Sequence, residues 1–137
     1  MSMTLKLSVN PKLIHSTVTG EFSLDEAKRI FLETLDVVAE HKIEKVIVDG
    51  QQLSGELNTT ERFYYAEFMS QSVMNFARTR SWAPQFAFVL KTPVLDQNKF
   101  GETVAVNRGM NVRVFGNMED AFEWLGETPV APDEVID

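Results

Sequence analysis

Residues 44–55 read EKVIVDGQQLSG, and this stretch decides the predicted fold. Val46, Ile47 and Val48 are three consecutive β-branched residues, a pattern that favours a strand. Because this apolar run does not alternate with polar residues, we expect helices to cover both faces of the strand, as in a parallel sheet. We expect the strand to stop at Asp49 and Gly50 and a loop to follow. Binding sites in open α/β sheets collect at such carboxyl ends, so this is where we expect functional residues.

The segments on either side predict the order β-β-α-β-α-β-α-β-α. The predicted strands are residues 4–9, 13–19, 44–49, 85–90 and 112–115, and the predicted helices are residues 23–42, 60–80, 96–108 and 117–126. The first two strands flank Asn10-Pro11 and should form an antiparallel hairpin. After the hairpin, strands and helices alternate, which predicts parallel strands with right-handed crossovers.

Helix starts are predicted from three local signals. Ser23 and Glu26 have the spacing of a capping box, in which each side chain bonds the backbone N–H of the other residue. Thr59 and Asn117 are suitable N-caps for the second and the last helix. The helix ends are predicted at Gly109 and Gly126, which suit a left-handed stop.

Length and composition limit the function classes. A chain of 137 residues is expected to form one domain, here residues 1–126, with residues 127–137 as a loose acidic tail that holds two prolines and four acids. The net charge of −7 and the absence of a dense Lys/Arg cluster argue against nucleic acid as a partner. No apolar run is long enough to span a membrane, and no secretory signal is found, so we expect a cytoplasmic protein without membrane insertion.

The predicted second helix carries more apolar surface than packing on a sheet requires. Its apolar residues are Phe63, Tyr64, Tyr65, Ala66, Phe68, Met69, Val73, Met74, Phe76 and Ala77. At 100° per residue these spread over more than half of the circumference, whereas one face is enough for a helix on a sheet. Three interpretations remain open for the surplus: deep burial in the core, a subunit interface, or a lid over an apolar pocket.

Few residues in the chain suggest chemistry. His15 and His41 are the two histidines, and neither has an acidic residue at metal-motif spacing; no cysteine and no glycine-rich nucleotide loop is present. We therefore expect no metal, no cofactor and no catalytic activity. Asp49 can act as a base or a partner contact, or simply cap the following loop. Ser54 can be a phosphorylation site or a turn residue beside Gly55.

The element order and four motifs resemble a known family. The motifs are Asp49–Gly55 (DGQQLSG), Phe100 followed by Val104–Gly109 (VAVNRG), Val112–Phe115 (VRVF) and Asp120–Leu125 (DAFEWL). Together, over residues 4–126, they resemble the SpoIIAA-like family of STAS/SEC14-domain proteins, which is related to the anti-sigma factor antagonists. The resemblance implies a mixed sheet of four or five strands with helices mainly on one face, and it does not imply an enzyme. In the sporulation antagonists a phosphorylated serine directly follows the strand's aspartate, whereas here Gly50 follows Asp49 and the nearest serine is Ser54.

Three hypotheses for function follow from the residues and the resemblance. The first is a regulatory protein-binding module, with a homodimer as one form of it, and the second is a carrier or sensor of a small apolar ligand, as the SEC14 label suggests. The third, an enzyme, rests on Asp49 and Ser54 and requires these two side chains to converge. For the first two, the predicted partner- or ligand-binding residues are Asp49, Ser54, Gly55, Tyr64, Tyr65, Phe68 and Met69.

Overall fold

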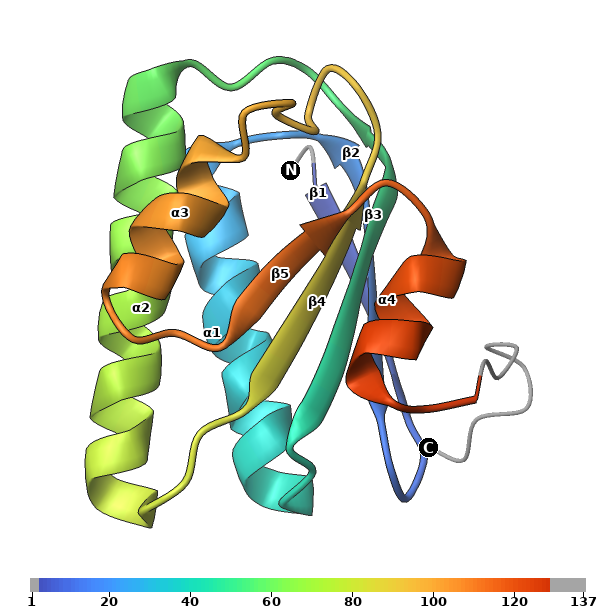
Figure 1. The fold of residues 1–137 in the computed structure, drawn as a ribbon, viewed down its shortest axis with the longest axis vertical. Coiled ribbons are helices and arrows are strands. Elements are labelled where there is room, and N and C mark those ends of the chain that lie inside the picture. The colour runs from blue at the N-terminus through green and yellow to red at the C-terminus, as the bar shows by residue number, and fades with distance from the viewer. Residues whose placement is uncertain (1–2, 129–137) are drawn as a thin grey trace.

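The computed structural model describes residues 3–128, which form a five-stranded sheet between two helical layers (Figure 1). The strands are β1 (Met3–Val9), β2 (Ile14–Glu21), β3 (Lys45–Ser54), β4 (Gln85–Leu90) and β5 (Val112–Phe115). The helices are α1 (Leu24–His41), α2 (Thr59–Arg80), α3 (Phe100–Asn107) and α4 (Met118–Leu125). The predicted order of elements is therefore confirmed.

The sheet keeps the strands in chain order, β1-β2-β3-β4-β5, so that β3 lies at its centre. β1 and β2 form the predicted antiparallel hairpin, and the other neighbours pair in parallel. The Asn10 side chain holds the hairpin turn, because its Oδ1 accepts hydrogen bonds from the backbone N–H groups of Lys12 (2.9 Å) and Leu13 (2.8 Å).

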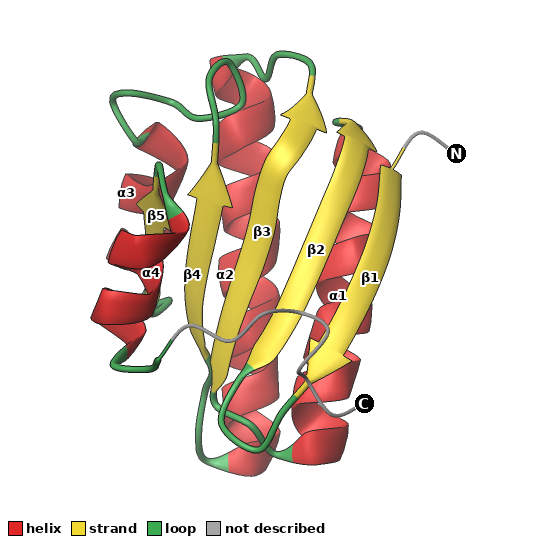
Figure 2. Cartoon of the chain, turned by 90° about the vertical axis from the view of Figure 1, so that its right-hand side faces the viewer, coloured by secondary structure: helices red, strands yellow, loops and turns green. Residues whose placement is uncertain are grey.

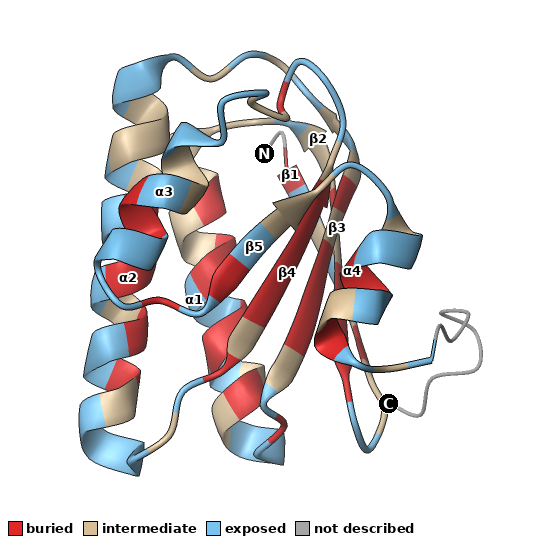
Figure 3. Cartoon of the chain, viewed as in Figure 1, coloured by how far each residue is buried: buried red, intermediate tan, exposed pale blue. Residues whose placement is uncertain are grey.

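The two faces of the sheet carry cores of different size. Helices α1, α2 and α3 cover one face with the larger core, which includes Val46 and Val48, whereas α4 covers the other face over β3, β4 and β5 (Figure 2). Ile47 points into this smaller core with Val89 and Phe122. Most residues of β4 are buried, and so is the apolar run of β3, whereas the second half of β3 is mostly not (Figure 3). The unbroken apolar run of β3 thus has the cause that the sequence indicates: cover on both faces.

One prediction for β3 is wrong: the strand does not end at Asp49 but continues to Ser54. The pairing of β3 with β2 is irregular here. Thr17 pairs with Asp49 and the next pair is Thr19 with Gln52, so β3 holds one extra residue between the two pairs. Gly50 permits this close packing. A Cβ at that position would lie 2.8 Å from both Leu53 Cδ1 and Leu90 Cδ2.

The starts of three helices also differ from the predictions. Ser23 precedes α1 but makes no side-chain cap, and the Glu26 carboxylate accepts a hydrogen bond from the backbone N–H of Met3 (3.3 Å) instead. Asn58, not Thr59, caps α2, in a complete capping box with Glu61. α3 begins at Phe100 rather than Asp96, because the chain first makes a turn around the Asp96 side chain. The Asn117 cap of α4 is confirmed: its Oδ1 accepts a bond of 2.8 Å from the backbone N–H of Asp120.

The predicted C-terminal tail is described only at its start. Glu127 forms an ion pair of 2.7 Å with Lys45 at the beginning of β3. Residues 129–137 lie outside the described residues, so the loose tail stays a prediction.

Phe86 provides a test of the larger core. Its side chain is fully buried and lies 5.1 Å from the Phe31 ring and 6.3 Å from the Phe88 ring, centroid to centroid. We expect Phe86→Ala to lower the free energy of unfolding by about 3–5 kcal/mol in urea titrations, because it leaves a cavity in the core. Phe100→Ala is the matched control, since Phe100 is 36% exposed. Equal losses in the two variants would contradict this description of the core.

Candidate functional site

The predicted binding residues fall into separate regions of the fold. Asp49 lies on the α4 side of the sheet, Ser54 and Gly55 lie at the carboxyl end of β3, and the remaining four lie on α2. Within α2, Tyr65 and Met69 point toward the sheet, whereas Tyr64 is 50% exposed. Phe68 is half-buried beside an outer groove.

Asp49 has a buried histidine as its neighbour. His15 on β2 is only 4% exposed, and its Nε2 lies 3.8 Å from Asp49 Oδ2. The other carboxylate oxygen, Oδ1, accepts hydrogen bonds from the backbone N–H (3.1 Å) and the side-chain amide (3.0 Å) of Gln51. The contact with His15 is the main reason why the pKa of Asp49 lies below its ordinary value; partial burial opposes the shift, and the Gln51 bonds add to it.

The sequence did not indicate the proximity of His15 and Asp49. The two residues are far apart along the chain, and the pairing of His15 with Ile47 across the β2–β3 ladder brings them together. Only strand register reveals such a neighbour, and a single sequence does not provide it. The structure therefore adds His15 to the residues that define the α4 side of the sheet.

The lowered pKa of Asp49 predicts a pH dependence of stability. The ionised carboxylate is favoured in the fold, so its contribution is present above the unfolded-state pKa of about 3.9 and is lost as the pH falls through the lower folded-state pKa. We expect the free energy of unfolding of Asp49→Asn to fall less steeply with pH below about 4 than that of the wild type. The measurement is urea unfolding at a series of acid pH values.

The His15→Gln variant is the control for the cause of this effect. Because His15 is the main reason for the lowered pKa, this variant should also reduce the slope, and the double variant should show less than the sum of the two changes. An additive double variant would show that the two side chains do not interact.

Ser54 and Gly55 form the turn that leaves β3. The backbone oxygen of Ser54 accepts a hydrogen bond from Phe22 N–H (3.0 Å), and its hydroxyl donates a long one to the Gly20 carbonyl (3.4 Å). Gly55 adopts φ = +94°, in the left-handed region that favours glycine. Ser54 and Asp49 have different partners and are five residues apart on an extended strand, at about 3.3 Å per residue. The convergence that the enzyme hypothesis requires is therefore not found.

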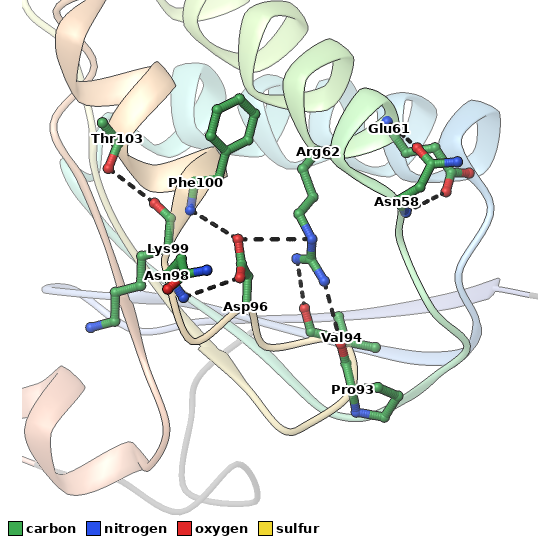
Figure 4. Close-up of polar contacts among 10 residues, drawn as sticks. All are labelled: Asn58, Glu61, Arg62, Pro93, Val94, Asp96, Asn98, Lys99, Phe100 and Thr103. Carbon is green, nitrogen blue, oxygen red and sulfur yellow. Dashed lines mark hydrogen bonds and ion pairs between the residues drawn. The ribbon is translucent and has the colours of Figure 1, made fainter.

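Arg62 in the first turns of α2 connects the helix to the β4–α3 loop (Figure 4). Its Nη1 donates to the Val94 carbonyl (2.9 Å), its Nη2 donates to the Pro93 carbonyl (3.3 Å), and its Nε lies 4.0 Å from Asp96 Oδ2. Asp96 in turn accepts bonds from the backbone N–H groups of Asn98 (3.1 Å) and Phe100 (3.0 Å). These bonds, with Arg62 in a smaller part, hold the pKa of Asp96 below its ordinary value.

The planar guanidinium of Arg62 bonds two carbonyl groups of the β4–α3 loop at once, and this predicts the effect of replacing Arg62 with lysine. Lysine keeps the charge but cannot reach two carbonyl groups with a planar fork, so Arg62→Lys should increase amide hydrogen exchange over residues 91–99 and cost about 1–2 kcal/mol of unfolding free energy. Arg78→Lys is the control, because exposed Arg78 makes one bond of 3.4 Å to Asn75 Oδ1. Unchanged exchange in Arg62→Lys would contradict the role of Arg62 in this loop.

The outer side of α2 carries an open groove. Tyr64, Phe68 and Met74 form its apolar part, and the charged residues Lys28, Glu67 and Arg108 border it. Lys28 Nζ lies 5.4 Å from the centre of the Phe68 ring, and an Arg108 guanidinium nitrogen lies 3.7 Å from a Glu67 carboxylate oxygen. The two aromatic side chains are thus presented between fixed charges of both signs.

The surplus apolar surface predicted for α2 is divided between two environments. Ala66, Met69, Val73 and Phe76 are buried in the larger core. Tyr64 and Met74, at 50% and 40% exposure, remain on the outer side. The helix is therefore partly core and partly available surface.

Two searches of the described part of the chain concern metals and membranes. Residues 3–128 contain no group of three or more His, Cys, Asp or Glu side chains placed to hold a metal ion. None of the helices described here is both long and apolar enough to cross a membrane.

Comparisons with known proteins identify a structural neighbour. No family model matches the sequence, and no curated protein matches it. The fold is similar to the crystal structure of an anti-sigma factor antagonist from Mycobacterium paratuberculosis, with a TM-score of 0.57 and 12% sequence identity over 92% of this chain and 96% of that one. The likeness confirms the predicted STAS-like fold.

Proposed function

We propose that this protein is a non-catalytic regulatory module that binds another protein through the outer side of α2. The fold supports the proposal, because the similar structure is that of an anti-sigma factor antagonist and the likeness extends over 92% of the chain. The cysteine-free sequence agrees with a cytoplasmic setting for such a module.

The observation that carries the proposal is the exposure of large apolar side chains in the groove on α2. Tyr64 and Met74 are 50% and 40% exposed and lie beside Phe68. Aromatic residues and Met are enriched at the centres of protein interfaces, where charged residues surround them. Lys28, Glu67 and Arg108 supply such a charged border.

The first candidate partner to test is a second copy of the chain. In a two-fold homodimer, the groove of one subunit would face the groove of the other. The contact would then bury Tyr64 and Phe68 of both subunits. Sedimentation velocity over a range of concentrations measures this association directly. If the protein stays monomeric at every concentration, the partner that binds the groove is a different protein.

Substitution of Tyr64 tests the surface itself. We expect Tyr64→Glu to weaken association with the partner by about 2 kcal/mol or more, because it places a charge at the apolar centre of the contact. Val106→Glu is the matched control, since Val106 on α3 is 48% exposed but does not line the groove. The measurement is the dissociation constant, from sedimentation for the homodimer or from calorimetry with a partner that the wild type captures from its host.

The outcome for Val106→Glu decides between the groove and general surface effects. If both variants lost the same affinity, or if neither lost any, the outer side of α2 would not be the binding surface. Both substitutions lie at exposed positions, so the folded state should persist in each.

The second hypothesis, a carrier or sensor of an apolar ligand, has no support from the structural neighbour. The enzyme hypothesis lacks its convergent pair of side chains, as described above.

A further inference from the structure

A cavity lies between the sheet and the helices of the larger core. Its volume is about 110 Å³. For comparison, a single water molecule needs roughly 10–15 Å³, and an engineered apolar cavity of about 150 Å³ in another protein binds benzene. The space is therefore too large for one water molecule and similar to that needed by a small ring compound.

The walls of the cavity are almost entirely apolar. All five strands contribute to them, and so do α1, α2 and α3, with large side chains that include Phe31, Tyr65, Met69 and Phe88. Among the lining residues only Lys99 is exposed, and it lies with Arg62, Asp96 and Glu102 at the β4–α3 end. This end of the cavity is polar, and Figure 4 shows that Arg62 and Asp96 there are already bonded to the loop.

One polar group in the cavity wall lacks a partner. Ser16 lies on β2 between Ile14 and Val18, on the side that faces the helices, and it is fully buried. Its Oγ has no hydrogen-bond partner within the described residues and no accessible surface, so a ligand in the cavity reaches it only when neighbouring side chains move slightly. A buried hydroxyl left without a partner costs free energy, so a group that bonds it would be favoured. Two lining residues on the helices, Thr34 and Tyr65, also carry hydroxyl groups, and that of Thr34 already donates to the Ile30 carbonyl (3.0 Å).

These observations define the chemistry of a ligand. The apolar walls favour a hydrocarbon ring or a short chain, and the unpaired Ser16 hydroxyl favours one hydroxyl or carbonyl group on it. A charged group among the apolar walls would be desolvated without a counter-charge, since the ionised lining residues lie at the β4–α3 end. The volume excludes a diacyl lipid.

We propose that the cavity binds a neutral, mainly apolar molecule of about the size of a substituted phenol, which hydrogen-bonds to Ser16 Oγ. This site is separate from the groove on α2, and the proposal does not depend on the protein-binding function.

The test compares p-cresol with toluene, two probes of nearly equal shape that differ by one hydroxyl group. Calorimetric titration of the full chain should show saturable binding of both, with p-cresol preferred about five- to tenfold, the gain expected of one hydrogen bond in a buried site. In Ser16→Ala the preference should disappear or reverse while toluene still binds. Ser70→Ala is the matched control, because Ser70 is also buried but donates to the Glu67 carbonyl and does not line the cavity.

The folding of Ser16→Ala is itself informative. Removal of an unpaired hydroxyl should leave the urea midpoint unchanged or raise it. A strong loss of stability would mean that Ser16 has a partner within the fold, and would overturn the proposal. In the wild type, amide chemical shifts give an independent readout: p-cresol should shift Ser16, Val48 and Met69 but not Tyr64 or Gln71.

Three further results would overturn the proposal. The first is the absence of saturable binding of either probe, which would leave a cavity that holds water only. The second is an equal preference for p-cresol over toluene in the wild type and in Ser16→Ala. The third is a set of amide chemical-shift changes confined to the groove on α2.

Discussion

Burial of β3 on both faces is the constraint on which the rest of the structure depends. Val46 and Val48 face one core and Ile47 faces the other, so a single strand joins the two helical layers. Each of these three side chains is less than a tenth exposed. At the end of this strand, Ser54 and Gly55 begin the connection to α2. The irregular pairing after Asp49 belongs to the same constraint, since it turns Leu53 back toward the larger core.

α2 connects the two proposed binding surfaces without making them one site. Neighbouring residues illustrate this: Tyr64 borders the outer groove, whereas Tyr65 lies edge-on to Phe22 and Phe31, with ring centres 6.1 and 6.5 Å apart. Burial of the Tyr65 hydroxyl raises its pKa above the ordinary value, because desolvation disfavours the phenolate. The position of the helix is set at its start by the Arg62 bonds to the β4–α3 loop and along its length by Met69, Val73 and Phe76. A helix with two such different sides has no single apolar stripe, which is why the sequence pattern left its role open.

Sequence reasoning reached the architecture because that depends on local patterns. The run Val46–Val48 placed β3, and alternation of apolar residues placed the hairpin. The sequence does carry a signal for the Asn58 cap of α2, since Glu61 follows at capping-box spacing, but the adjacent Thr59 is also a suitable type of cap. The contact of His15 with Asp49, the Arg62 bonds to Pro93 and Val94, and the unpaired Ser16 hydroxyl could not be predicted. Each of them depends on register or on loop conformation, which bring together residues that are distant in the chain.

The five strands lie in the sheet in the same order as in the chain, and this has a consequence for folding during synthesis. Each strand pairs with the one made just before it, so no later strand has to insert between two that are already joined. The sheet can therefore grow vectorially as the polypeptide leaves the ribosome, starting from the local β1–β2 hairpin, whose closure costs the least chain entropy. The vulnerable moment in such growth comes when β3 has joined β2 but β4 has not yet been made. At that point the hydrogen-bonding edge of an apolar strand is open to any neighbouring nascent chain.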